Sequence, residues 1–222
     1  MTKMNTKDLV DISKKIYLNN KDRIDKRVNS FNRIRKEGTN EEIFFELVYC
    51  ILAAGTSAEL AFKVHKILKK DRFVILASKE EIIEKLRTCY RFYNLRGTYI
   101  YQTRQFLQDA YYFNLRDIIN TDSADERRNF FVEKPEIIGV GMKVASHFLR
   151  NIGFNDYAIL DKHLVKIMKN FNLISESAKI PISRNKYLEY EDTLKEFSKK
   201  VDLTMGELDF VLWYHKTGKI IK

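Results

Sequence analysis

Two ionisable residues in the second half of the chain stand where helices are expected to begin. Lys143 follows the triplet Gly139-Val140-Gly141 and falls in the first turn of a predicted helix. An ammonium there faces the positive end of the helix dipole, which favours the neutral, nucleophilic amine. Asp161 directly precedes the next predicted helix, where backbone N–H groups keep a capping carboxylate ionised. A neutral amine beside a carboxylate suits attack at a carbon that develops positive charge.

The same residues have simpler explanations, which the pattern alone leaves open. Most lysines lie on the surface, and aspartate is a common helix cap. The glycines around Val140 predict a tight hairpin in which Val140 fills the core and the glycines adopt backbone angles closed to other residues. Bare backbone lets the N–H groups of the following helix approach a phosphate. Other helix–helix turns share these features, so the hairpin by itself is not specific for DNA.

The elements that must position these residues are predicted to be helical. Apolar residues recur at three- and four-residue spacing along most of the chain, whereas alternating, strand-like runs are short and few. Thr39 and Thr56 each precede acidic residues, as helix N-caps do. We therefore predict an all-α protein with its longest irregular stretch at 172–183. The predicted helices span about 7–18, 21–36, 41–54, 57–70, 79–88, 94–112, 123–133, 142–151, 162–171, 184–199 and 204–217.

The composition favours a polyanionic partner. The formal net charge is +10 and the pI about 9.4, and each Lys or Arg placed on a phosphate releases condensed counterions. A solvated surface rich in Lys and Glu would give a similar composition. The hydrophobic content of 45% suffices for a core in one domain or in two packed lobes. The N-terminus is polar and no apolar run approaches a membrane span, so we expect a soluble cytoplasmic protein.

Cysteine and histidine spacing gives no metal motif. The only cysteines are Cys50 and Cys89, whereas an iron–sulfur cluster needs about four. They are too far apart for a CxxC motif and are predicted to be small core residues. The four histidines lack HExxH or similar spacing, so we predict no catalytic metal. His147 could line the helix face that carries Lys143, or simply pack in the core.

The sequence GVGMKVA, followed by AILDKHL, resembles the helix-hairpin-helix DNA glycosylase superfamily. The resemblance implies that the hairpin Gly139–Gly141 grips the DNA backbone, with a structural monovalent cation at its carbonyls when DNA is bound. Lys143 matches the lysine that forms a Schiff base in bifunctional members, which both release the base and cleave the strand. Asp161 matches the aspartate that stabilises the developing positive charge.

Three further stretches resemble the archaeal 8-oxoguanine DNA glycosylases. The resemblance implies that Phe92 and Trp213 flank the flipped base and that the α-carboxylate of Lys222 lies near its pocket. Endonuclease III-like and adenine-mismatch enzymes carry a four-cysteine cluster after the aspartate, and this chain has no cysteine after Cys89. The resemblance thus implies neither an iron–sulfur cluster nor an organic cofactor. The stretches are ELVYCILAAGTSAE at 46–59, RFYNLR at 91–96 and ELDFVLWYHKTGKIIK at 207–222.

The resemblance also implies an architecture and a partner. Residues 1–222 would form one two-lobed helical unit with the DNA cleft between the lobes and the helix-hairpin-helix at about 127–151. The expected partner is double-stranded DNA containing oxidised guanine, bound by a monomer associated with the nucleoid. A pyrimidine-lesion glycosylase/lyase and a non-enzymatic DNA-binding module remain alternatives. Asp209 either serves the base pocket or decorates a helix.

Overall fold

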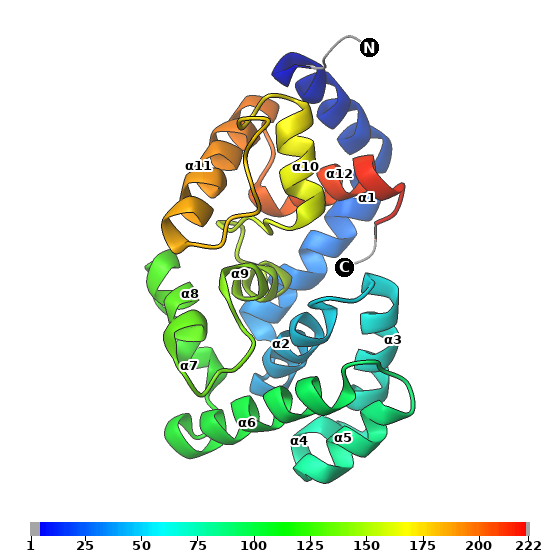
Figure 1. The fold of residues 1–222 in the computed structure, drawn as a ribbon, viewed down its shortest axis with the longest axis vertical. Helices are drawn as coiled ribbons and strands as arrows, with labels where there is room; N and C mark the ends of the chain where they lie inside the picture. The colour runs from blue at the N-terminus through cyan, green and yellow to red at the C-terminus, as the bar shows by residue number, and fades with distance from the viewer. Residues whose placement is uncertain (1–4, 221–222) are drawn as a thin grey trace. The chain divides into compact units, whose positions relative to one another are not determined.

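A computed structural model describes residues 5–220, in which all regular structure is helical (Figure 1). The chain divides into two compact units, each described by itself. One combines Met1–Arg33 with Leu149–Lys222, and the other is Ile34–Phe148. The boundaries fall inside two helices, α1 (Thr6–Glu37) and α9 (Met142–Asn151). No helix of the described residues is long and apolar enough to span a membrane.

The remaining helices agree with most of the predicted ranges. The short elements η1, α4 and α7 were not predicted, because each has too few residues to show a helical repeat. The elements are α2 (Asn40–Ala53), α3 (Ala58–Lys69), η1 (Lys70–Arg72), α4 (Phe73–Leu76), α5 (Lys79–Arg87), α6 (Tyr93–Tyr111), α7 (Leu115–Ile119), α8 (Ala124–Glu133), α10 (Lys162–Asn170), α11 (Arg184–Val201) and α12 (Met205–Thr217).

The first helix corrects a prediction. Separate helices were predicted at 7–18 and 21–36, whereas α1 is a single helix of 32 residues. Asparagine is a weak helix former, but the Asn20 side-chain amide donates to the Ile16 carbonyl and stays within the helix. Ile24 and Phe31 beyond this point are buried. Packing of this apolar face overrides the local preference.

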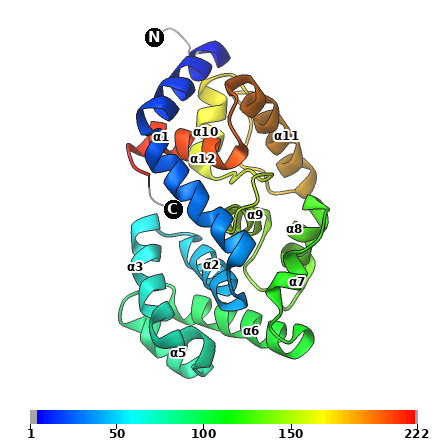
Figure 2. The same ribbon diagram turned by 180° about the vertical axis from the view of Figure 1, so that it is seen from behind.

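In the unit Met1–Arg33 with Leu149–Lys222, α1 packs on α12 (Figure 2). The rings of Phe31 and Phe210 stack with their centroids 6.0 Å apart, and the Tyr17 hydroxyl donates to Glu207. Burial, together with the negative charge of Glu207, raises the pKa of Tyr17 to about 12 and keeps this donor protonated. These contacts hold the helix that carries Trp213.

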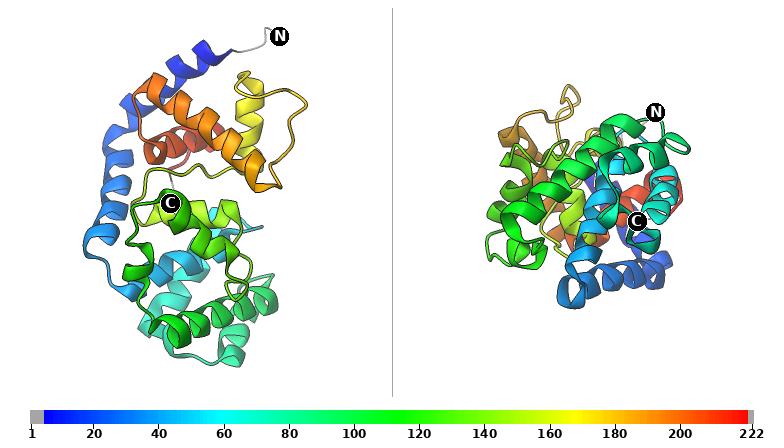
Figure 3. Two further views of the ribbon diagram at one scale, coloured as in Figure 1. Left: turned by 90° about the vertical axis from the view of Figure 1, so that its left-hand side faces the viewer. Right: turned by 90° about the horizontal axis from the view of Figure 1, so that it is seen from below.

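The segment between α10 and α11 is irregular, as predicted, and swings outward before α11 begins (Figure 3). Two contacts tie it down. The Lys169 ammonium donates to the Ala178 carbonyl over 3.1 Å, and the Ser183 hydroxyl accepts from the Lys186 backbone N–H as the N-cap of α11. The segment therefore returns the chain to α11 at a defined place.

In the unit Ile34–Phe148, α2 is the central helix and is buried along nearly its whole length. Capping boxes at Thr39 and Ser78 set the starts of α2 and α5. The predicted cap at Thr56 is wrong by one residue, because Ser57 accepts the Leu60 N–H and caps α3. Helix α6 crosses closely over α5 at Gly97, because a Cβ there would lie only 2.8 Å from Ile83 Cγ1. The buried guanidinium of Arg104 donates to the Val74 carbonyl and anchors α6 further along.

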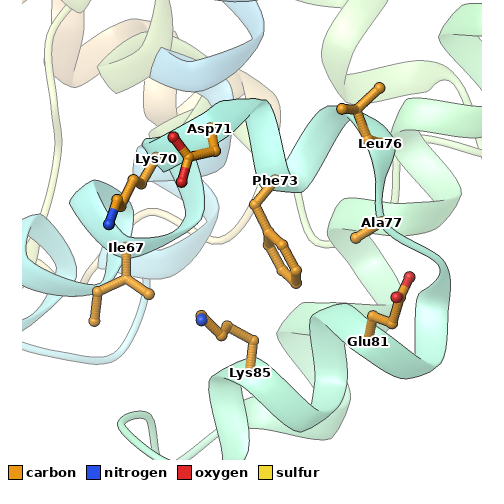
Figure 4. Close-up of a pocket in the computed structure, with 8 residues that line it drawn as sticks. All are labelled: Ile67, Lys70, Asp71, Phe73, Leu76, Ala77, Glu81 and Lys85. Atoms are coloured by element: carbon orange, nitrogen blue, oxygen red, sulfur yellow. The ribbon is translucent and has the colours of Figure 1, made fainter.

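A surface hollow of about 410 Å³ lies among α3, η1, α4 and α5 (Figure 4). The Phe73 ring points into it, and the Lys85 ammonium lies 5.5 Å from the ring centre. The exposed side chains of Ile67 and Leu76 contribute apolar walls. None of the residues predicted to do chemistry lines this hollow, so it is separate from the candidate site.

Candidate active site

The hairpin between α8 and α9 is a tight turn in which Val140 is buried and Gly141 faces open space. Val140 is 4% exposed, so its side chain fills the core, as predicted. Gly139 has a φ of +78°, a conformation that glycine adopts without strain, whereas Gly141, contrary to the prediction, has no positive φ. A Cβ at Gly141 would meet nothing within 4 Å, and the Gly141 carbonyl accepts the Ala145 N–H, which starts α9. The backbone at the start of α9 is therefore sterically open beside Gly141.

Lys143 is the second residue of α9 and is half-buried. The next two residues, Val144 and Ala145, are buried and hold this turn against the core. The structure thus places Lys143 in the first helical turn after the hairpin, as predicted. An amine held by a packed helix start has a defined position from which to react.

Asp161 is the N-cap of α10, as predicted from its place before the helix. Its Oδ1 accepts from the backbone N–H groups of His163 and Leu164, each over 2.8 Å. These bonds fix the plane of a half-buried carboxylate. Asp161 belongs to the unit that contains residues 149–222, whereas Lys143 belongs to the unit 34–148.

Trp213 lies in the same unit as Asp161 and is linked to it through His163. The rings of His163 and Trp213 meet edge to face, with centroids 5.9 Å apart and an interplanar angle of 82°. The backbone N–H of His163 also donates to Asp161. The structure therefore brings together Asp161, at the start of α10, and Trp213 on α12.

Phe92 lies directly before α6, at the N-cap position, and is half-buried. The Tyr90 ring contacts it edge to face, and the Arg91 guanidinium lies 5.1 Å from its ring centre. A Cβ at Gly55, which has a φ of +85°, would lie 3.8 Å from the Phe92 ring. Phe92 is therefore packed beside the loop that follows α2, in the same unit as Lys143.

An ion pair that sequence reasoning missed supports α12. Arg150 is 3% exposed, and its Nη2 donates to Asp209 Oδ2 over 2.8 Å. Its guanidinium also packs against the stacked rings of Phe31 and Phe210, at 5.2 and 4.7 Å from their centres. Asp209 is one helical turn before Trp213. The signal available in the sequence was a lone arginine in the apolar stretch SHFLRNIGF.

His147 packs in the core, which was one of the two alternatives predicted for it. It is 9% exposed, and its ring meets Tyr49 edge to face at 5.7 Å. Tyr49 in turn contacts His65 in the same geometry. The three rings fill the space among α2, α3 and α9.

The remaining predictions concern metals and the C-terminus. Cys50 is buried and Cys89 half-buried, and neither forms a disulfide. Among the described residues, no group of three or more His, Cys, Asp or Glu side chains is arranged to hold a metal ion. Lys222 lies outside the described residues.

Residues 24–203 match the family described as 8-oxoguanine DNA glycosylase. The chain belongs to this family. A relative from Methanocaldococcus jannaschii, named 8-oxoguanine DNA glycosylase/AP lyase, is 40% identical over 204 residues, covering 91% of this chain and 93% of the relative. A relative of the same name from Picrophilus torridus is 40% identical over 196 residues, covering 88% of each chain. The predicted family is confirmed.

Solved structures of the 8-oxoguanine DNA glycosylase family share this fold. The Thermotoga maritima enzyme has a TM-score of 0.87 and 33% identity, with 98% of this chain and 100% of that chain covered. The M. jannaschii enzyme in complex with a 15mer DNA containing 8-oxoguanine has a TM-score of 0.87 and 35% identity, with 96% and 99% covered. A trapped endonuclease III–DNA intermediate, 18% identical with a TM-score of 0.57, shares the fold. The predicted all-α, helix-hairpin-helix glycosylase fold is confirmed.

Proposed function

We propose that this chain is a bifunctional DNA base-excision repair enzyme, which removes 8-oxoguanine from duplex DNA and then cleaves the strand. Relatives that match most of its length are named 8-oxoguanine DNA glycosylase/AP lyase, and one is solved with DNA containing that lesion. The observation that carries the proposal is Lys143 in the first turn of α9, directly after the glycine hairpin, in a chain of this family.

In the proposed reaction, Lys143 Nζ forms a bond to C1′ of the lesion nucleotide while the bond from C1′ to the base breaks. The base leaves with a proton. Opening of the sugar ring converts the amine adduct into a protonated imine, the Schiff base. A proton then leaves C2′ and the bond from C3′ to oxygen breaks, so the 3′ phosphate departs by β-elimination. Water hydrolyses the imine and restores Lys143.

Asp161 has an electrostatic role in this proposal. The sugar develops positive charge as the base departs, and an ionised carboxylate held in place lowers the energy of that state. The two backbone N–H bonds to Oδ1 support this role, because they fix the carboxylate before the reaction begins. The nucleophile is part of the chain, so the proposed reaction uses no organic cofactor.

The hairpin Gly139–Gly141 would hold the DNA backbone as part of a helix-hairpin-helix at about 127–151. The open backbone at Gly141 and the start of α9 suit a phosphate, because first-turn N–H groups lack acceptors within the helix. The backbone carbonyl oxygens of the hairpin are ligands that hard cations prefer. We therefore propose that they hold a structural monovalent cation when DNA is bound. We propose a monomer that acts on the chromosome in the cytoplasmic nucleoid.

Phe92, Trp213 and Lys222 would recognise the extruded base. Flipping a base costs a few kcal/mol, and stacking on aromatic faces recovers part of this cost. The half-buried positions of Phe92 and Trp213 support the proposal, because each ring is held by neighbours yet keeps an accessible surface.

Borohydride trapping tests the proposed function. Incubation with a duplex containing one 8-oxoguanine should give a covalent protein–DNA adduct, because borohydride reduces an imine to a stable amine. An undamaged duplex of the same sequence should give none. A non-enzymatic DNA-binding module would bind both duplexes and be trapped on neither, and that result would overturn the proposal.

A panel of lesion duplexes separates the proposed substrate from the alternative. Strand cleavage should be fastest at 8-oxoguanine, whereas a pyrimidine-lesion glycosylase/lyase would prefer oxidised thymine or cytosine. A duplex with a pre-formed abasic site reports lyase activity alone.

A further inference from the structure

The hairpin rests on an aromatic ring of α6. A Cβ placed on Gly139 would lie 2.4 Å from Cδ2 and 2.6 Å from Cε2 of Tyr99. Real side-chain atoms do not approach this closely, so the Tyr99 ring occupies the place that a side chain at residue 139 would need. Two features therefore require a glycine at position 139: its positive φ and the Tyr99 ring that occupies the space of a side chain.

Arg96, one turn earlier on α6, connects this ring to the loop after α2. Its guanidinium lies 5.5 Å from the Tyr99 ring centre, and its Nη1 would be 3.3 Å from a Cβ on Gly139. Its Nη2 donates to the Ala54 carbonyl over 2.9 Å. Arg96 thus bonds to the C-cap residue of α2, contacts Tyr99 and lies beside Gly139 of the hairpin.

The same loop reaches the proposed base pocket. Tyr90 donates from its hydroxyl to the Leu52 carbonyl at the end of α2, and its ring contacts Phe92. Gly55, the residue after Ala54, packs beside the Phe92 ring. The Arg96 guanidinium therefore connects the loop beside Phe92 to the Tyr99 ring on which the hairpin rests.

We infer that Arg96 and Tyr99 are positioning residues that hold the hairpin Gly139–Gly141 in its DNA-binding conformation and in register with the loop beside Phe92. We call the pair the Arg96–Tyr99 bracket. The inference rests on the proposed function, because it assigns the means by which the proposed hairpin grip is held. A rigid hairpin binds a phosphate without first being ordered, and removal of the bracket returns that ordering cost to the binding step.

The bracket differs from a direct phosphate contact in a measurable way. A cation that touches a phosphate releases about one counterion, and its loss lowers the slope of log Kd against log salt by about one unit. Tyr99 carries no charge. Replacing it with leucine should therefore weaken binding with the salt slope unchanged.

Four variants test the bracket on two duplexes, one undamaged and one with a pre-formed abasic site. Tyr99→Leu removes the ring, and Tyr99→Phe keeps it. Arg96→Met removes the guanidinium and its N–H donors, and Arg96→Lys keeps the positive charge. Tyr101→Leu is the matched control, because Tyr101 forms the same kind of ring–guanidinium pair with Arg104 on the same helix, at 5.0 Å, and Arg104 bonds to Val74 instead of the loop after α2.

Tyr99→Leu and Arg96→Met should raise Kd about tenfold on both duplexes, the size that loss of one ordered contact gives. Cleavage of the abasic duplex at saturating enzyme should stay within about twofold of wild type. Tyr99→Phe should recover wild-type affinity, and Arg96→Lys should not, because an ammonium cannot reach Ala54 and stack on Tyr99 in the same geometry. The Tyr101→Leu control should bind as wild type.

An unchanged Kd for Tyr99→Leu would overturn the proposed role of the bracket. An Arg96→Met variant that binds as wild type but loses cleavage at saturating enzyme would also overturn it. A drop of about one unit in the salt slope for Arg96→Met, with no effect of Tyr99→Leu, would make Arg96 a phosphate contact instead. Failure of the wild-type protein to cleave duplexes with 8-oxoguanine or an abasic site would refute the proposed function. The affinity of the variants for the undamaged duplex would still test the bracket.

Discussion

Lys143 and Asp161 both stand at the start of a helix, but the structure holds them by different means. Asp161 is fixed by two hydrogen bonds from the backbone of its own helix. Lys143 takes its position from the packing of Val144 and Ala145 and from the hairpin before it. Removal of the Asp161 side chain therefore loses both the cap and the charge, whereas a change at Lys143 removes only the reactive amine.

Lys143→Gln should abolish the borohydride-trapped adduct and lower base release by more than about 1,000-fold, because the nucleophile is lost. Binding to the lesion duplex should remain within a few fold of wild type. Lys79→Gln is the matched control, since Lys79 is also half-buried in the first turn of a helix, α5, outside the site. Full trapping by the Lys143 variant in a gel assay would show that another amine reacts.

Asp161→Asn separates the charge of Asp161 from its capping role. The amide oxygen still caps α10, so the free energy of unfolding should fall by about 1 kcal/mol at most. Single-turnover base release should nevertheless fall by about 100- to 1,000-fold, because the negative charge is gone.

Ser183→Ala provides the converse comparison for Asp161. It removes the cap of α11 and should cost about 1 kcal/mol of stability with base release intact. Wild-type activity in Asp161→Asn would mean that Asp161 is only a cap.

At the scale of elements, the two hairpin glycines should respond differently to alanine. Gly139→Ala forces a positive φ on alanine and drives its Cβ into the Tyr99 ring. We expect a loss of at least about 1–3 kcal/mol of stability and a melting temperature lower by several degrees. Gly141→Ala has open space around its Cβ, so its thermal unfolding should match wild type.

DNA binding should fall in both glycine variants, for different reasons. Gly139→Ala distorts the turn, whereas the methyl group of Gly141→Ala stands between the start of α9 and an approaching phosphate. Titration of a labelled undamaged duplex measures this. Unaltered binding by Gly141→Ala would mean that the phosphate does not approach the backbone at Gly141.

Helix α12 depends on a buried ion pair, and this gives Asp209 a structural role. Asp209→Ala leaves the guanidinium of Arg150 buried without its carboxylate, which costs about 3–5 kcal/mol when such a pair is broken. Asp192→Ala breaks an exposed pair with Lys195 and should change stability by about 1 kcal/mol or less. Urea unfolding of both variants measures the difference. Equal, small losses would show that the Arg150 pair contributes nothing to stability.

At the scale of the whole molecule, we predict that a change at Lys222 impairs recognition of the lesion but leaves strand cleavage itself intact. A terminal carboxylate accepts a hydrogen bond from the N7 proton of oxidised guanine and repels the lone pair of guanine at the same position. Unpaired buried polar groups cost about 1–3 kcal/mol, so one such contact gives substantial discrimination. This interpretation of Lys222 comes from the resemblance alone and stays a prediction.

Appending a short tail after Lys222 should reduce cleavage of the 8-oxoguanine duplex far more than cleavage at a pre-formed abasic site. The abasic site needs Lys143 but no base recognition, so it serves as the internal control. Equal losses on both substrates would indicate a folding defect, and no loss on either would mean that the base pocket lies elsewhere.

Part of this protein could be predicted from the sequence because the signals are local. A glycine hairpin followed by a helix start, and an aspartate followed by an amphipathic helix, are complete within a few residues. Lys143, Asp161 and most of the helices were predicted for this reason. The break predicted within α1 was wrong, because burial of Ile24 and Phe31 outweighs the weak helix propensity of Asn20.

Contacts between distant residues were decided only by the tertiary structure. Arg96 and Ala54 are 42 residues apart, Arg150 and Asp209 are 59 apart, and no periodic pattern connects either pair. The approach of Tyr99 to Gly139 and of His163 to Trp213 likewise depends on how whole helices cross. Helix periodicity states which face is buried but not which partner covers it. The sequence thus determined the reactive groups and their helices, and packing decided what holds each of them in place.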